Sequence, residues 1–195
     1  MNNNLYLYHY FSKENGPFLS MSDLPAEEAK KIVENHDRVS AERDGREYIE
    51  NESDFHGQEL RRLIEIEMRN KFAAKDGKIL RKYPYYMILR NDDMSDGAIY
   101  YDDFIKIPVE EFDMSVVSFT YGDSTQNSDP GTFSDKPYWN KVYTYDEILE
   151  IIKEYGWITE TNDWNWRIPC YIEAQLWSDT QIDKYKKTYH SNDKI

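Results

Sequence analysis

The sequence predicts an α+β fold in which one long helix and two shorter helices pack on a mostly antiparallel or mixed five-stranded sheet. Apolar and polar residues alternate in five segments, which is the pattern of β-strands. Short turn-forming segments separate the second, third and fourth of these, which favours hairpins over βαβ units. Another stretch repeats apolar residues at helical spacing. The expected strands are Leu5–Phe11, Tyr85–Leu89, Ile99–Ile107, Val116–Tyr121 and Tyr171–Trp177.

The first expected strand, LYLYHYF, carries side chains suited to burial on both of its faces. Its apolar residues fall on one face together with His9, and its three tyrosines fall on the other. A strand with both faces occupied is typical of the interior of a sheet.

Two helices are expected between the first and second strands. Ser22 opens the first, with Pro25 in its first turn and two glutamates near the positively polarised end. The longer pattern runs from about Asp44 to Ala74, with apolar residues three or four apart. Gly57 lies inside this pattern and leaves two alternatives, one continuous helix or two helices with a kink.

The fourth expected strand ends in a turn that places polar residues at the edge of the sheet. In VVSFTYGDS (residues 116–124), Ser118 and Thr120 occupy one face. Gly122 permits a sharp turn that residues with a Cβ resist. Asp123 and Ser124 are therefore expected at the opening of whatever the sheet encloses.

The remaining segments are a long loop, a third helix and a tail. Residues 122–140 are expected to form a polar loop of the length that serves as a lid or a binding loop. The third helix begins with a capping box, Thr144-Tyr-Asp-Glu147, and ends at Gly156. A Trp-rich loop is expected over residues 159–166, and the tail from about residue 184 is expected to fray.

Composition indicates one folded domain over residues 1–195 and disfavours one class of binding partner. The chain has 24 basic and 37 acidic residues and a net charge of −13, which disfavours general nucleic-acid binding. Cys170 is the single cysteine, so no internal disulfide is expected. Neither a leader segment nor a long apolar run is present, which predicts a cytoplasmic protein without a membrane span.

Common catalytic and metal-binding motifs do not occur in the sequence. It has no Gly-rich phosphate loop, Cys-x-x-Cys, His-Glu-x-x-His or Gly-x-Ser-x-Gly motif. The run from Asp92 to Gly97 resembles the start of a calcium loop, but Met94 stands where an oxygen ligand is required, so a solvated turn is expected. The four histidines lack the spacing of a zinc site, and no metal is expected.

Several polar residues interrupt the apolar strands and are the candidates for function. Glu173 and Gln175 share one face of the last strand, and His9 lies in the first. If Glu173 faces a pocket, burial raises its pKa and suits it to acid–base work. The alternatives are a solvent-exposed face for Glu173 and Gln175, and a hydrogen-bonded core position for His9.

Four segments resemble a bacterial family of uncharacterised proteins: LYLYHYF, SDLPAEEA (22–29), SFTYGDS (118–124) and YIEAQLWSD (171–179). The chain is also similar, over short β motifs, to small ADP-ribosyltransferase-type domains, through Tyr8-His9, Ser20 and Glu173. It differs from them in carrying Glu173 before Gln175 rather than after it.

The second resemblance implies NAD as a nucleotide ligand. His9 would then hydrogen-bond its ribose or phosphate, tyrosines would stack on the nicotinamide, and Glu173 would stabilise an oxocarbenium-like transition state. His9 and Glu173 are the expected catalytic residues. The expected substrate-binding residues are Ser20, Tyr10, Tyr121, Asp123, Ser124 and Gln175.

An alternative function is a non-enzymatic, acidic protein of the immunity or inhibitor type that captures a basic protein partner. Charge complementarity would raise its association rate. The anchors would be aromatic side chains exposed as one patch, whereas an enzyme would bring His9 and Glu173 into one cleft. The aromatic residues concerned, which packing of two loops onto the body would equally explain, are Tyr138, Trp139, Trp157, Trp164 and Trp166.

Overall fold

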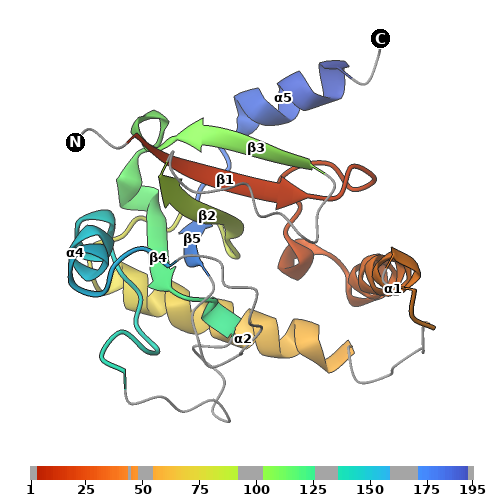
Figure 1. Cartoon of the computed structure of the whole chain (residues 1–195), viewed down its shortest axis with the longest axis horizontal. Helices are drawn as coiled ribbons and strands as arrows, with labels where there is room; N and C mark the ends of the chain where they lie inside the picture. Colours follow the sequence, from red (N-terminus) through yellow and green to blue (C-terminus); the bar gives the residue numbers. More distant parts are fainter. Residues whose placement is uncertain are drawn as a thin grey trace.

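A computed structural model describes residues 4–43, 45–47, 55–91, 103–125, 136–158 and 171–192. It confirms the α+β fold, and within these residues it shows a five-stranded sheet and the four α-helices named below (Figure 1). The strands are β1 (Leu5–Phe11), β2 (Tyr85–Asn91), β3 (Asp103–Pro108), β4 (Val117–Tyr121) and β5 (Ile172–Leu176). The helices are α1 (Ala26–Arg43), α2 (Phe55–Ala73), α4 (Tyr145–Tyr155) and α5 (Asp183–Asn192).

Every strand pair in the sheet is antiparallel, and the strand order is β3-β1-β2-β5-β4. The first strand therefore lies inside the sheet, as its two occupied faces predict. The last strand, β5, lies between β2 and β4, where Glu173 pairs with Ile88 on one side and Thr120 on the other. Gln175 likewise pairs with Tyr86 and Ser118.

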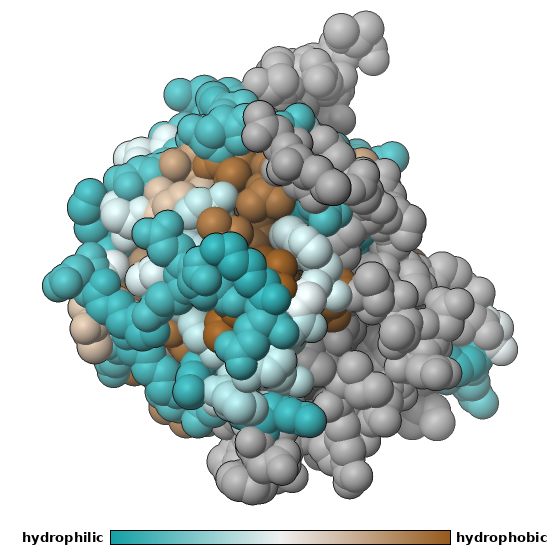
Figure 2. All heavy atoms as spheres, turned by 60° about the vertical axis from the view of Figure 1, so that its left-hand side comes forward, coloured by the Kyte–Doolittle hydropathy of each residue, from teal (hydrophilic) through white to brown (hydrophobic). Residues whose placement is uncertain are grey.

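Paired residues in adjacent strands point to the same face, so the register divides the sheet into two faces. The apolar face carries Leu7, Leu89, Ala174 and Phe119, which belong to the main hydrophobic core. Ile148 of α4 and Ile182, just before α5, are buried in that core. Where the α4 side comes forward in Figure 2, a strip of hydrophobic residues is visible between hydrophilic ones.

The opposite face is unusually rich in polar groups, and we call it the polar face. Helix α2 crosses it (Figure 1) and packs Ile64, Met68 and Phe72 with Trp177 in a second apolar cluster. The strand residues of the polar face are Tyr6, Tyr8, Tyr10, Tyr86, Ile88, Arg90, Phe104, Lys106, Pro108, Ser118, Thr120, Glu173 and Gln175.

The helices differ from the prediction in number and extent. Instead of one long helix over 44–74, the structure has α1 with 18 residues and α2 with 19, so two helices are long. Gly57 lies inside α2 and does not interrupt it, while the kink region expected before it falls mostly outside the described residues. Ser22 belongs to a short 3-10 helix, Met21–Asp23, that precedes α1.

Two predictions about the second half of the chain have different outcomes. The capping box is confirmed, because Thr144 Oγ1 accepts from Glu147 N and Glu147 Oε2 accepts from Thr144 N. In the tail that is expected to fray, residues 184–192 belong to α5, which ends at Asn192, and the remaining residues lie outside the described part of the chain. Among the described residues, no helix combines the length and apolar character needed to cross a bilayer.

Candidate functional site

A chain of hydrogen bonds along the polar face fixes the orientation of Gln175. Trp177 Nε1 can only donate, and its partner is Ser118 Oγ at 2.9 Å. The Ser118 hydroxyl therefore donates to Gln175 Oε1 at 2.7 Å. The amide nitrogen of Gln175 is left to face Glu173 Oε1 at 2.8 Å and Thr120 Oγ1 at 3.2 Å. The buried network thus supplies one defined donor to the Glu173 carboxyl group.

Glu173 is only 6% exposed, and its surroundings favour the neutral carboxylic acid. Burial and then the negative charge of Asp123 raise the pKa of Glu173 to about 8, against weaker opposing effects of Ser124, Gln175 and Arg61. While Oε1 accepts from Gln175, Oε2 makes no hydrogen bond of ordinary geometry with the described residues. At neutral pH the acid therefore holds a proton, and Oε2 is the oxygen free to donate it.

Asp123 lies beside Glu173 because of the pairing of the last two strands. Tyr121, which ends β4, pairs with Ile172, which begins β5, so the residues just beyond this pair meet at one end of the sheet. Asp123 Oδ1 accepts from Thr125 N at 2.7 Å, and Oδ2 accepts from the Tyr171 hydroxyl. Both carboxylate oxygens are thereby occupied.

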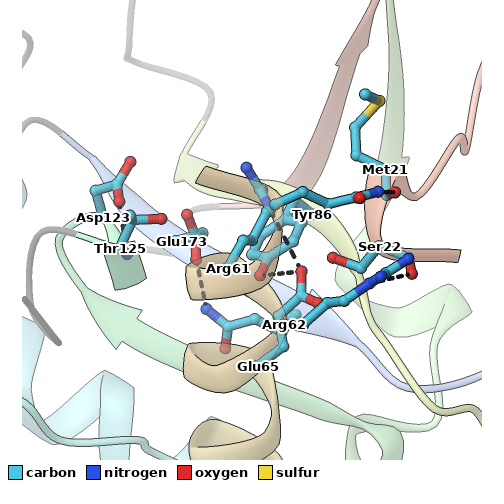
Figure 3. Close-up of polar contacts among 11 residues, drawn as sticks. Met21, Ser22, Arg61, Arg62, Glu65, Tyr86, Asp123, Thr125 and Glu173 are labelled. Atoms are coloured by element: carbon cyan, nitrogen blue, oxygen red, sulfur yellow. Dashed lines mark hydrogen bonds and ion pairs between the residues drawn. The ribbon is translucent and has the colours of Figure 1, made fainter. Parts of the chain in front are cut away.

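Helix α2 adds a charged group to this face of the sheet. Arg61 Nε donates to Glu65 Oε1 at 3.3 Å, and its guanidinium carbon lies 4.4 Å from the centre of the Tyr86 ring. The Tyr86 hydroxyl donates to the same Glu65 oxygen at 2.9 Å. In Figure 3, Arg61 lies between Glu173 on one side and Glu65 on the other, and its charge lowers the pKa of both.

Glu65 is fully buried and anchors this arrangement. Burial raises the pKa of Glu65, and Ser22, Arg61 and Tyr86 oppose that rise. The segment carrying Ser22 is held against α2 by Arg62, which donates to the carbonyl oxygens of Ser22 at 3.1 Å and Leu24 at 2.8 Å. The Arg61–Glu65–Tyr86 group therefore joins α2, β2 and the 3-10 helix.

His9 does not join Glu173, which corrects the expected catalytic pair. His9 lies on the apolar face, where its Nε2 accepts from Phe18 N at 2.7 Å and its Nδ1 therefore donates to Tyr86 O at 2.8 Å. Its ring stacks on that of Phe18 with centroids 4.2 Å apart. Burial lowers the pKa of His9 to about 4, so the ring is neutral. Phe18 has φ of 60°, a left-handed conformation that the bond to His9 helps to hold.

The other predicted site residues divide between the two faces. Tyr10 is on the polar face of β1, where it stacks on Tyr8 at 6.0 Å. Tyr121 is on the apolar face and donates to Gly156 O at 2.9 Å. Ser20 is buried immediately before the 3-10 helix. Around Glu173 the structure brings together Gln175, Asp123 and Ser124 of the predicted set, and not His9 or Tyr121.

Sequence reasoning missed Arg61, Glu65 and Tyr86, although α2 carries a signal for two of them. Arg61 and Glu65 are four residues apart and share the helical stripe of the buried residues Met68 and Phe72. Charged residues within an apolar stripe must either reach solvent or bond to partners. Arg61 and Glu65 within this stripe therefore indicate a buried ion pair.

The predicted partner-binding aromatics do not form an exposed patch within the described residues. Tyr138, Trp139 and Trp157 are half-buried, and Tyr138 and Trp157 pack against the main core. Trp164 and Trp166 lie outside the described residues, as do Cys170 and the run from Asp92 to Gly97. Within the described part of the chain, no three His, Cys, Asp or Glu side chains are placed to hold a metal.

Comparison with protein-family models, curated proteins and solved structures finds no match to this chain.

Proposed function

We propose that the polar face binds a small polar ligand beside Glu173 and that Glu173 acts there as a general acid. The main support for this proposal is the hydrogen bonding and protonation of the Glu173 carboxyl group. Its Oε1 is fixed by Gln175, its Oε2 lacks a partner among the described residues, and burial beside Asp123 keeps its proton on at neutral pH. Enzymes raise the pKa of acidic residues in this manner when a proton must be given up near pH 7.

The surroundings of Glu173 suit both the protonated form that precedes proton transfer and the carboxylate that follows it. Asp123 disfavours a second negative charge and so keeps the proton on Glu173 before transfer. After transfer, the carboxylate is stabilised by Gln175, by the nearby Ser124 hydroxyl and by the charge of Arg61. The proton would pass from Oε2 to an oxygen or nitrogen of the bound ligand.

The sequence resemblance makes NAD the first ligand to test, but a protonated Glu173 lacks the negative charge that would stabilise the oxocarbenium-like transition state of ADP-ribosyl transfer. Glu173 is the part of that resemblance that this site retains. His9 has no role in it, because both ring nitrogens bond backbone groups on the opposite face. The tyrosine beside the site is Tyr86 rather than Tyr121.

A thermal-shift panel of nucleotides, dinucleotides including NAD, sugars and small acids tests the proposal. A ligand that binds only the folded protein raises its unfolding midpoint. The shift produced by such a ligand is expected to shrink above pH 8 in the wild type, because Glu173 then loses the proton it donates. In Glu173→Gln the side-chain amide remains a neutral hydrogen-bond donor at every pH. The ligand-induced rise in the unfolding midpoint of this variant is therefore expected to stay constant with pH.

Glu150→Gln is the matched control, since it makes the same substitution at an exposed position on α4. It is expected to behave as the wild type does. A panel that produces no shift, or a pH dependence that Glu173→Gln leaves unchanged, would overturn the proposed function.

A further inference from the structure

We infer that the ligand of this site carries an oxyanion, either a carboxylate or a phosphate, that binds the guanidinium group of Arg61. The inference rests on the proposed function because it takes Glu173 and Arg61 to contact the same ligand. It adds the chemical class of the group that the ligand must present.

Within the described residues, Arg61 has hydrogen-bond donors at the surface that are not used. Its Nε bonds Glu65, whereas its two terminal nitrogens have no partner among the described residues. The Arg61 side chain remains 39% exposed, while Glu65 beneath it is fully buried. Two N–H groups of a planar guanidinium match the two oxygens of a carboxylate or phosphate.

The guanidinium group of Arg61 is already held in place before any ligand binds. Glu65, one helical turn after Arg61, fixes Nε, and the Tyr86 ring supports the plane of the group at 4.4 Å. Tyr86 is in turn fixed by its hydrogen bond to Glu65. A side chain that is ordered before binding loses less conformational entropy when the ligand arrives.

Two of the buried polar groups around Glu173 can donate a hydrogen bond, while the unpaired acceptor Glu65 Oε2 lies on the other side of Arg61. The Ser124 hydroxyl is buried without a bond of ordinary geometry, and Glu173 has its protonated Oε2. The Asp123 carboxylate already accepts hydrogen bonds from Thr125 N and the Tyr171 hydroxyl, so it does not require a cationic ligand. A ligand rich in acceptor oxygens therefore satisfies the site better than an amine does.

The test uses the full chain with sodium phosphate in one arm and sodium acetate in another, each compared with sodium chloride at equal ionic strength. NMR of the arginine Nε–H groups in the wild type needs no variant and reports on Arg61 directly. Phosphate or acetate is expected to shift the Arg61 signal in a saturable manner, and the arm with the stronger response identifies the preferred oxyanion.

Two variants of α2 then separate this site from general charge effects. Arg61→Gln is expected to lose the rise in unfolding midpoint that the anion gives the wild type. Arg69→Gln removes the same charge from the same helix, away from the Tyr86 ring, and is expected to keep it. Arg61→Lys, which keeps the charge but not the planar fork, is expected to retain only part of the effect.

An unmoved Arg61 signal in both arms overturns the inference, as does an equal anion effect in Arg61→Gln and Arg69→Gln. The two proposals fail separately. If neutral ligands bind with a pH dependence that requires Glu173 while neither anion binds, this inference falls and the proposed function stands. If an anion binds through Arg61 but no ligand shows that pH dependence, the proposed function falls instead.

Discussion

Glu173 and His9 are both buried, and burial shifts their pKa values in opposite directions. For Glu173 the pKa rises from 4.5 to about 8, so the folded protein holds a proton that the unfolded chain releases. For His9 the pKa falls from 6.5 to about 4, so the unfolded chain binds a proton that the folded protein does not. The two residues therefore contribute to the pH dependence of stability with opposite signs.

The sign for each residue gives a testable pH profile. Glu173 favours folding at low pH, and this contribution declines as pH rises from 4.5 through about 8. His9 favours folding above pH 6.5, and this contribution declines as pH falls from 6.5 through about 4. Below pH 6.5 the two oppose each other. Between pH 6.5 and 8 Glu173 acts without this opposition, and the free energy of unfolding is expected to fall by about 2 kcal/mol.

Urea unfolding at a series of pH values measures this profile. In Glu173→Gln the decline between pH 6.5 and 8 is expected to be much smaller, with a remainder from Glu65, whose pKa is also raised. A wild-type profile that is flat or rising over this interval would show that Glu173 is already ionised in the folded protein.

The sequence identifies some of the buried polar residues but not which of them lie together on one face of the sheet. The alternation in YIEAQLW correctly places Glu173 and Gln175 on one face, and a hydrogen-bonded core position for His9 was among its alternatives. Alternation does not reveal which face of one strand lies beside which face of the next, because that depends on register. His9 and Glu173 were therefore expected in one site although they lie on opposite faces.

At the scale of single elements, α4 owes its start to local chemistry that the sequence shows directly. The Thr144 side chain accepts a hydrogen bond from the backbone N–H of Glu147, and the Glu147 side chain accepts one from the backbone N–H of Thr144. Thr144→Ala is expected to lower the free energy of unfolding by about 1 kcal/mol in urea unfolding. Glu154→Gln, near the other end of α4, serves as the control. Equal stability of Thr144→Ala and wild type would mean that the cap contributes nothing.

Helix α5 was missed because its contacts with the sheet are largely polar. The Tyr85 hydroxyl donates to Asp179 Oδ1 at 2.8 Å and accepts from Lys186 Nζ at 2.9 Å, and Lys186 belongs to α5. The guanidinium carbon of Arg81 lies 3.3 Å from the centre of the same ring. A helix attached in this way lacks the apolar stripe by which helices are recognised in a sequence.

Tyr85→Phe is expected to loosen α5 selectively, since it removes the hydroxyl that joins Asp179 and Lys186 but leaves the ring in the core. The net contribution of one such hydrogen bond is about 1 kcal/mol. Amide hydrogen exchange is expected to accelerate in α5 and to remain slow in β1 and β5. Uniform acceleration across the sheet, or none in α5, would contradict this anchoring role.

At the scale of the whole molecule, the sheet separates two sets of buried polar groups. His9 is in β1 and Glu173 is in β5, with β2 between them, so their backbones are about 10 Å apart and their side chains diverge. The stability effects of His9→Gln and Glu173→Gln are therefore expected to add within about 0.5 kcal/mol in the double variant.

Ser118→Ala with Glu173→Gln provides the contrasting pair, because both residues bond Gln175. Their coupling energy is expected to exceed that of the first pair in a double-mutant cycle measured by urea unfolding. Strong coupling between His9 and Glu173 would instead place them in one network.

The general architecture was predictable because each strand carries its own local pattern. The starts of β1 and β2, the end of β4 at Tyr121 and the place of β5 follow from alternation and turn residues. The order β3-β1-β2-β5-β4 does not, because inserting β5 between β2 and β4 depends on contacts between residues far apart in the chain. The position of α2 over the polar face, which supplies Arg61 and Glu65, depends on those contacts too.

Carbon-13 NMR of glutamate carboxyl groups measures whether Glu173 holds a proton at neutral pH. The Glu173 signal, assigned by its loss in Glu173→Gln, is expected to titrate with a midpoint near pH 8. A midpoint near 4.5, the ordinary value for glutamate, would show an ionised side chain and remove the basis for its role as a general acid.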